Sequence, residues 1–85
     1  MEHIIVTTTN VKKAFLYDLD VPTDLTIDKL KDDMVEALNG YDPNLFLRTA
    51  TTELFCNRLG RQLTAEETLE SAGVWNGDYI TLLEV

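Results

Sequence analysis

The chain has 85 residues, which is enough for one hydrophobic core, so residues 1–85 are expected to form a single domain. Its 7 basic and 15 acidic residues give a formal net charge of -8, which disfavours nucleic acid and anionic membrane surfaces as partners. No apolar run approaches the roughly 18 residues of a membrane span, and the chain opens directly into a strand pattern rather than a signal peptide. We therefore expect a cytoplasmic protein without direct membrane insertion.

Two strands are predicted near the start of the chain. Residues His3–Thr9 are rich in β-branched side chains and predict the first strand. Residues Ala14–Val21 alternate in polarity and predict the second strand, which Pro22 ends because it lacks the N–H that a sheet requires. Its inward face is expected to carry Phe15, Tyr17, Leu19 and Val21, and its wet face Leu16, Asp18 and Asp20. Such alternation is typical of an antiparallel hairpin with one buried and one solvated face.

A helix is predicted from Thr26 to Asn39. Thr26 is expected to be the N-cap, with its hydroxyl accepting a hydrogen bond from a free backbone N–H of the first turn. Apolar residues follow at spacings of three and four and predict one stripe that faces the core: Ile27, Leu30, Met34 and Leu38. The Asn39-Gly40 pair is expected to supply a left-handed C-cap.

The segment from Tyr41 to Glu53 has only a weak pattern. Asp42-Pro43 predicts a turn or a single helical turn, and Leu45 and Leu47 are candidates to pack under the core. The conformation of this segment stays open.

Two more strands, a short strand and a capped turn are predicted in the rest of the chain. Leu54–Arg58 predicts the third strand, followed by a turn and a short strand around Gln62-Leu63. Thr64 is expected to cap a helical turn, with a following glutamate close to a capping box. The Asn76-Gly77 pair is typical of a tight turn, and Tyr79–Leu83 alternates again and predicts the last strand.

No residue pattern points to catalysis. His3 is the only histidine and forms no recognisable motif with a serine or cysteine. Cys56 is the only cysteine, so an intrachain disulfide is excluded. It falls on the inward face of the third predicted strand, where a thiol is poorly ionised. Adjacent carboxylates fall on predicted solvent faces. We therefore expect no enzymatic activity, no metal site and no cofactor.

The predicted order of elements is hairpin, helix, strand, short strand, turn and strand, which is the β-grasp order. The sequence therefore predicts an α+β fold with a mixed sheet of four to five strands packed on one main helix. Three stretches carry a family resemblance: YDLDVP at Tyr17–Pro22, TIDKL at Thr26–Leu30 and RLGRQLTAEETLESAGVWNGDYITLL at Arg58–Leu83. The chain resembles ubiquitin-like domains, and more closely the YukD and EsaB group of type VII secretion systems and the ubiquitin-like domain of their EccD component.

The resemblance implies non-covalent protein binding rather than conjugation. In ubiquitin the last strand continues into a tail with two glycines, whose terminal carboxylate an activating enzyme adenylates. This sequence has Leu83-Glu84-Val85 in that place. The resemblance therefore implies an accessory or regulatory protein of a type VII secretion system, peripheral to the membrane complex, with a membrane component or an ATPase of that system as its partner. Its oligomeric state stays open.

Two candidate interfaces follow from the ubiquitin-like strand order. The outer face of the sheet is expected to carry Ile5, Phe55, Thr81 and Leu83. Trp75 precedes the tight turn and is either an interface anchor or a lid folded onto the edge of the core.

Two other functions fit a ubiquitin-like chain. One is a non-catalytic subunit of a multicomponent monooxygenase, as in the toluene monooxygenases, where such a domain packs on a catalytic subunit. The other is a sulfur carrier or protein modifier, against which the missing glycines argue.

Overall fold

The computed structural model describes residues 2–84, so the predictions that involve Met1 and Val85 lie outside the described residues. The strands are β1 (His3–Asn10), β2 (Tyr17–Pro22), β3 (Thr52–Cys56), β4 (Arg61–Gln62) and β5 (Tyr79–Glu84). The α-helices are α1 (Ile27–Tyr41) and α2 (Leu69–Ala72), and two short 3-10 helices are η1 (Pro43–Leu45) and η2 (Thr49–Thr51).

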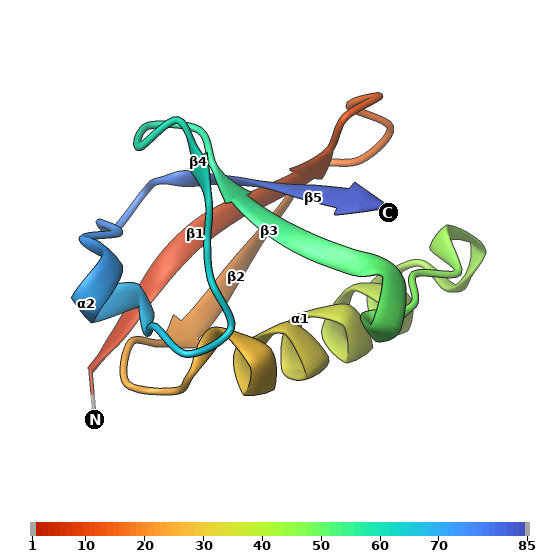
Figure 1. The fold of residues 1–85 in the computed structure, drawn as a ribbon. Coiled ribbons are helices and arrows are strands. Elements are labelled where there is room, and N and C mark those ends of the chain that lie inside the picture. The colour runs from red at the N-terminus through yellow and green to blue at the C-terminus, as the bar shows by residue number, and fades with distance from the viewer. Residues whose placement is uncertain (1, 85) are drawn as a thin grey trace.

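The strands form one mixed sheet in the order β2-β1-β5-β3-β4. β1 and β5 are parallel neighbours, and the other neighbouring pairs are antiparallel. Figure 1 shows α1 lying across one face of this sheet, with α2 at the opposite end of the molecule from η1. The predicted α+β fold of β-grasp type, with one main helix and a mixed sheet, is confirmed.

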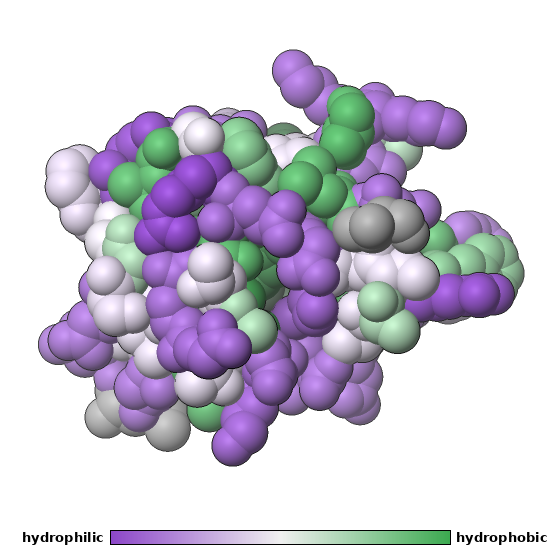
Figure 2. Space-filling view, viewed as in Figure 1, coloured by the Kyte–Doolittle hydropathy of each residue, from purple (hydrophilic) through white to green (hydrophobic). Residues whose placement is uncertain are grey.

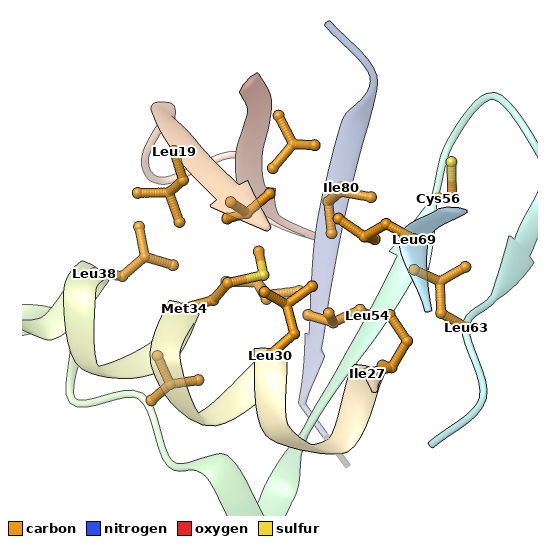
Figure 3. Packing of buried hydrophobic residues seen from close by; sticks show 14 of the residues in the cluster. Leu19, Ile27, Leu30, Met34, Leu38, Leu54, Cys56, Leu63, Leu69 and Ile80 are labelled. Atoms are coloured by element: carbon orange, nitrogen blue, oxygen red, sulfur yellow. The ribbon is translucent and has the colours of Figure 1, made fainter. Parts of the chain in front are cut away.

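The core lies between α1 and the inner face of the sheet. The four stripe residues of α1 predicted to face the core are each at most 2% exposed: Ile27, Leu30, Met34 and Leu38. They point toward buried side chains of the sheet such as Leu54 and Ile80 (Figure 3). The helical spacing places the apolar side chains of α1 on one face, and strand alternation does the same for the sheet. These two apolar faces pack together, and their burial stabilises the fold.

In the first hairpin the side chains point to the predicted faces of the sheet, but the loop between the two strands is longer than predicted. β2 begins at Tyr17 rather than at Ala14. The pairing of β1 with β2 ends at Thr8 and Tyr17, and beyond it the carbonyl of Phe15 accepts a hydrogen bond from the hydroxyl of Thr9 at 2.7 Å. Phe15 is nevertheless buried, as predicted.

The free N–H groups at the N-terminus of α1 donate to a segment far away in the sequence rather than to the side chain of the N-cap residue. Thr26 occupies the N-cap position, but its side chain makes no capping hydrogen bond, so that part of the prediction is wrong. Instead the N–H groups of Ile27 and Asp28 donate to the carbonyl oxygens of Glu67 and Ala65, at 2.8 and 3.2 Å. Because free N–H groups of a first turn need only one acceptor each, the hydroxyl of Thr26 is not required there.

The predicted left-handed C-cap at Asn39-Gly40 is also wrong. α1 continues through Gly40 and ends at Tyr41, and Asp42 is its C-cap with an extended backbone. The Tyr41 ring packs on Tyr17 with 5.6 Å between centroids, which favours the additional helical residues. The amide of Asn39 points to the loop instead, where its Nδ2 donates to the Leu47 carbonyl and its Oδ1 accepts from the Leu47 N–H, at 3.0 and 2.9 Å.

The weakly patterned segment forms two short 3-10 helices. Asp42 caps η1 by accepting from the N–H of Asn44 at 3.1 Å, which confirms the predicted helical turn. Leu47 is buried and Leu45 packs partly against the core, also as predicted. Between them Phe46 has a left-handed backbone (φ 51) and is 77% exposed.

Several strand boundaries in the second half differ from the prediction: β3 begins at Thr52 rather than Leu54, and β5 ends at Glu84 rather than Leu83. β3 ends at Cys56 because the Cys56 carbonyl accepts the Gly60 N–H that closes the following turn. The short strand is Arg61–Gln62, while Leu63 turns inward and is 1% exposed.

The capping box lies at Thr68 rather than at Thr64. The Thr68 hydroxyl accepts from the Ser71 N–H at 3.0 Å, and the Ser71 hydroxyl accepts from the Thr68 N–H at 2.9 Å, which begins α2. Glu67 accepts a hydrogen bond from the backbone N–H of Thr64, so only half of the predicted box is present there. Leu69 plugs the core behind this turn, at 1% exposed.

Candidate functional site

A groove runs along the outer face of the sheet, on the side away from α1. We call it the sheet groove. It is bordered by the loop between β1 and β2, the outer faces of β3 and β5, and the turn before β5. Its apolar lining comes mainly from Val11, Phe15, Leu16, Phe55, Tyr79 and Leu83.

The strand register explains why these side chains point outward. Phe55 lies opposite Thr81, and Leu83 lies opposite Glu53. The alternate residues of β5, Ile80 and Leu82, are buried against the helix side at 0% and 1% exposed. Since successive strand residues point to opposite faces, their neighbours must face the groove.

The structure brings three of the predicted interface residues together in the sheet groove: Phe55, Thr81 and Leu83. Asn57 also lines the groove, and its Oδ1 accepts from the Thr81 hydroxyl at 2.6 Å. These positions follow from the alternation of the predicted strands.

Ile5 does not belong to this group. β1 and β5 pair from Thr7 and Tyr79 onward, so Ile5 lies before the paired stretch, next to the tight turn. Its N–H donates to Asn76 Oδ1 and its carbonyl accepts from the Gly77 N–H, both at 2.7 Å. Ile5 is 40% exposed but does not line the sheet groove.

Sequence reasoning missed the contribution of the loop between β1 and β2. Val11 and Leu16 are 68% and 62% exposed and form one end of the sheet groove. Figure 2 shows apolar atoms at this loop, with hydrophilic side chains projecting beyond them. One signal was available: Leu16 is an apolar residue on the predicted solvent-facing side of its strand, between Phe15 and Tyr17, which were predicted to face inward.

Trp75 stands beside the sheet groove and is 65% exposed, so it is not a lid on the core. The guanidinium carbon of Arg58 lies 3.8 Å from the centroid of its ring, within cation–π distance. Arg58 Nε donates to the two carboxylate oxygens of Asp78 at 2.9 and 3.0 Å, and the backbone N–H of Trp75 donates to Asp78 Oδ2 at 2.8 Å. The exposed indole ring is therefore held in place by the hydrogen-bonded network of Arg58 and Asp78.

Asp78 is the centre of that network. Its burial raises the pKa of the carboxyl, but the hydrogen bonds from Arg58 and from the Trp75 N–H lower the pKa more, so the net shift is downward. Arg58 also donates to the carbonyl of Gly73, which joins the end of α2 to the same network. Asp78 is thus an ionised structural group on the border of the sheet groove.

The residues weighed for chemistry lie apart from one another. His3 Nδ1 is 3.0 Å from Asp20 on the first hairpin, while Cys56 is fully buried with its Sγ 3.9 Å from Asp78. Within residues 2–84, no group of three or more His, Cys, Asp or Glu side chains is arranged to hold a metal ion. Nor does this part of the chain contain a helix with the length and apolar character needed to span a membrane.

Comparison with known proteins identifies a family. A family model described as "WXG100 protein secretion system (Wss), protein YukD" matches residues 3–82. No match was found among the curated proteins.

The fold is shared with solved ubiquitin-like structures. A ubiquitin from Caldiarchaeum subterraneum is 26% identical, with a TM-score of 0.75 and coverage of 99% of this chain and 95% of that one. The EccD5 ubiquitin-like domain from Mycobacterium xenopi is 14% identical, with a TM-score of 0.79 and coverage of 100% and 97%. The ubiquitin-like domain of the Mycobacterium tuberculosis type VII secretion system protein ECCD1 is 19% identical, with a TM-score of 0.76 and coverage of 99% and 100%.

Proposed function

The chain belongs to the YukD family of the WXG100 protein secretion system, and from that premise we propose that it binds a protein component of the secretion machinery through its sheet groove. The binding is non-covalent, and the protein acts in the cytoplasm beside the membrane complex. Its partner is a membrane component or the ATPase of that system. The chain has an accessory or regulatory role and performs no chemistry itself.

One observation carries the proposal: an apolar groove lies open on a rigid sheet. Phe55 and Leu83 project from neighbouring strands that are hydrogen-bonded along their length, so they lose little conformational freedom when a partner docks. Apolar side chains gathered on one open face are typical of a protein interaction site. Trp75 and Arg58 extend the same face with a type of residue pair that is enriched at interface hot spots.

The test is a binding measurement with purified soluble parts of the secretion ATPase and membrane components. Leu83→Asp places a carboxylate in the apolar floor of the sheet groove, so we expect affinity to fall by at least about tenfold. The melting temperature should change little because Leu83 points away from α1.

Phe46→Asp is the matched control. It makes the same apolar-to-acidic change at a side chain that is 77% exposed and outside the sheet groove. Equal affinities for wild type, Leu83→Asp and Phe46→Asp would rule out the sheet groove as the binding surface.

A further inference from the structure

Acidic residues are almost excluded from the sheet groove. The chain has 15 Asp and Glu residues, yet Asp78 is the only one of them among the described residues that line the groove. Asp78 is 8% exposed and its charge is matched by Arg58. The residues that line the groove are therefore less acidic than the chain as a whole, and Glu53, which lies opposite Leu83, is paired with Lys31.

Two lysines lie in the loop between β1 and β2, which forms one end of the groove. Lys12 and Lys13 are exposed, and none of the ion pairs formed within residues 2–84 involves either of them. Lys13 lines the groove together with Val11 and Leu16. Free positive charge and apolar surface thus meet at one end of the groove.

The backbone of Lys13 adds an independent observation. Its φ of 53 is left-handed, a conformation that glycine or asparagine adopts at lower cost than lysine. The turn is fixed around it, since the Lys13 N–H donates to the Asn10 carbonyl at 3.0 Å and the Ala14 N–H donates to Asn10 Oδ1 at 2.8 Å. Lysine stands where glycine or asparagine would be less strained, and such backbone outliers concentrate at functional sites.

If the sheet groove is the binding surface proposed above, its charge pattern defines the ligand. We propose that the occupant is a short apolar peptide segment of the partner, flanked on one side by acidic residues. Its apolar side chains lie over Phe55 and Leu83, and its carboxylates lie over Lys12 and Lys13. A segment with basic flanks would instead face two unpaired lysines.

The expected charge preference is opposite to the one that the whole molecule predicts. A protein with a net charge of -8 attracts basic peptides over long distances. Exposed ion pairs are individually weak, so the lysines mainly set the orientation of the segment and its association rate. Preference for an acidic flank can therefore arise only from charges close to the bound segment.

Two synthetic peptides test the proposal, with the same leucine-rich core and either a run of glutamates or a run of lysines on one side. We expect the glutamate peptide to bind about tenfold more tightly at low salt by fluorescence anisotropy, and the difference to shrink as salt is added. Chemical shifts should change at Phe55, Leu83 and Lys13.

Charge reversal is the decisive variant. Lys12→Glu combined with Lys13→Glu should invert the preference, whereas Lys29→Glu combined with Arg48→Glu makes the same change in net charge outside the groove and should leave it intact. Lys13→Asn suits the left-handed backbone, so it should keep full stability while weakening binding of the glutamate peptide severalfold.

The outcomes separate this proposal from the proposed function. Tighter binding of the lysine peptide, equal binding of both, or no binding of the glutamate peptide would overturn the acidic flank. The sheet groove would still stand as a binding surface if Leu83→Asp weakened binding of a secretion component. The function proposed for the groove fails if Leu83→Asp leaves such binding unchanged.

Discussion

Glu67 is a single residue that holds an irregular segment in place. Its carboxylate accepts hydrogen bonds from both terminal nitrogens of Arg61, each at 2.9 Å, and from the N–H of Thr64. The hydrogen bonds from Arg61 are the main cause that lowers its pKa from 4.5 to about 2, against the opposing effect of burial. The same residue offers its backbone carbonyl to the first turn of α1.

Replacement of this carboxylate should make stability depend on pH in a defined way. A carboxyl whose pKa is lower in the folded than in the unfolded state stabilises the fold above the unfolded pKa. This contribution is lost as the pH falls from about 4.5 toward 2. Glu67→Gln should therefore lower the free energy of unfolding by about 1–2 kcal/mol at neutral pH, a value reduced by solvent screening of the half-exposed Arg61.

Urea unfolding followed by circular dichroism at a series of pH values measures this difference. The gap between wild type and Glu67→Gln should narrow from about pH 4.5 downward and close only near pH 2, where the Glu67 carboxyl of the folded protein becomes protonated. Glu66→Gln, at the exposed neighbouring carboxylate, is the control and should stay close to wild type throughout. A gap that persists unchanged in acid would contradict the role given to the Glu67 charge.

Among the elements, α1 shows how tertiary contacts set the ends of a helix. Its first N–H groups donate to carbonyls at residues 65 and 67, and its last turn is extended by the contact between the rings of Tyr41 and Tyr17. Gly40 therefore lies inside the helix, and a Cβ added there would meet no atom within 4 Å.

Gly40→Ala should stabilise the protein by about 0.5–1 kcal/mol, because alanine has the higher helix propensity and loses less backbone entropy on folding. A glycine in a left-handed C-cap would give the opposite sign. Gly77→Ala provides the comparison, since Gly77 has a φ of 90 and alanine there should be destabilising. Thermal unfolding measures whether each variant is more or less stable than wild type. A loss of stability in Gly40→Ala would mean that α1 ends before Gly40.

The arrangement of elements could be predicted from the sequence because it follows from local periods. Spacings of three and four in α1 and alternation in β5 are visible in the sequence, and they placed Leu30, Phe55 and Leu83 on the correct faces. Helix ends could not be predicted, since they depend on residues far away in the chain. The path of the loop that carries Val11 and Leu16 over the sheet has no period at all, so that end of the groove was missed.

For the whole molecule, the uneven distribution of charge should affect stability. Four carboxylates are exposed on the outer side of α1: Asp28, Asp32, Asp33 and Glu36. Their mutual repulsion, in a protein with a net charge of -8, disfavours the compact state.

Added salt should therefore stabilise the protein. When the Debye length falls from roughly 30 Å to about 8 Å, repulsion between exposed carboxylates is screened, while the partly buried pair of Arg58 and Asp78 is screened much less. We expect the free energy of unfolding to rise by up to about 1 kcal/mol. Urea unfolding at low and at physiological salt measures this change. A lower free energy of unfolding at the higher salt concentration would mean that attractive ion pairs outweigh the repulsion between carboxylates.

The position of β5 in the sheet has a consequence for the protein during its synthesis. β5 follows every other strand in the chain, yet it lies between β1 and β3 and is the neighbour of both. While a ribosome is still adding residues 79–84, the nascent chain can form the first hairpin and the pair of β3 and β4, but no strand yet connects them into one sheet. The edges of β1 and β3 that β5 covers stay exposed until this strand arrives, so we expect chaperones that guard emerging polypeptides to meet a partly folded chain and the sheet to be completed in one late step.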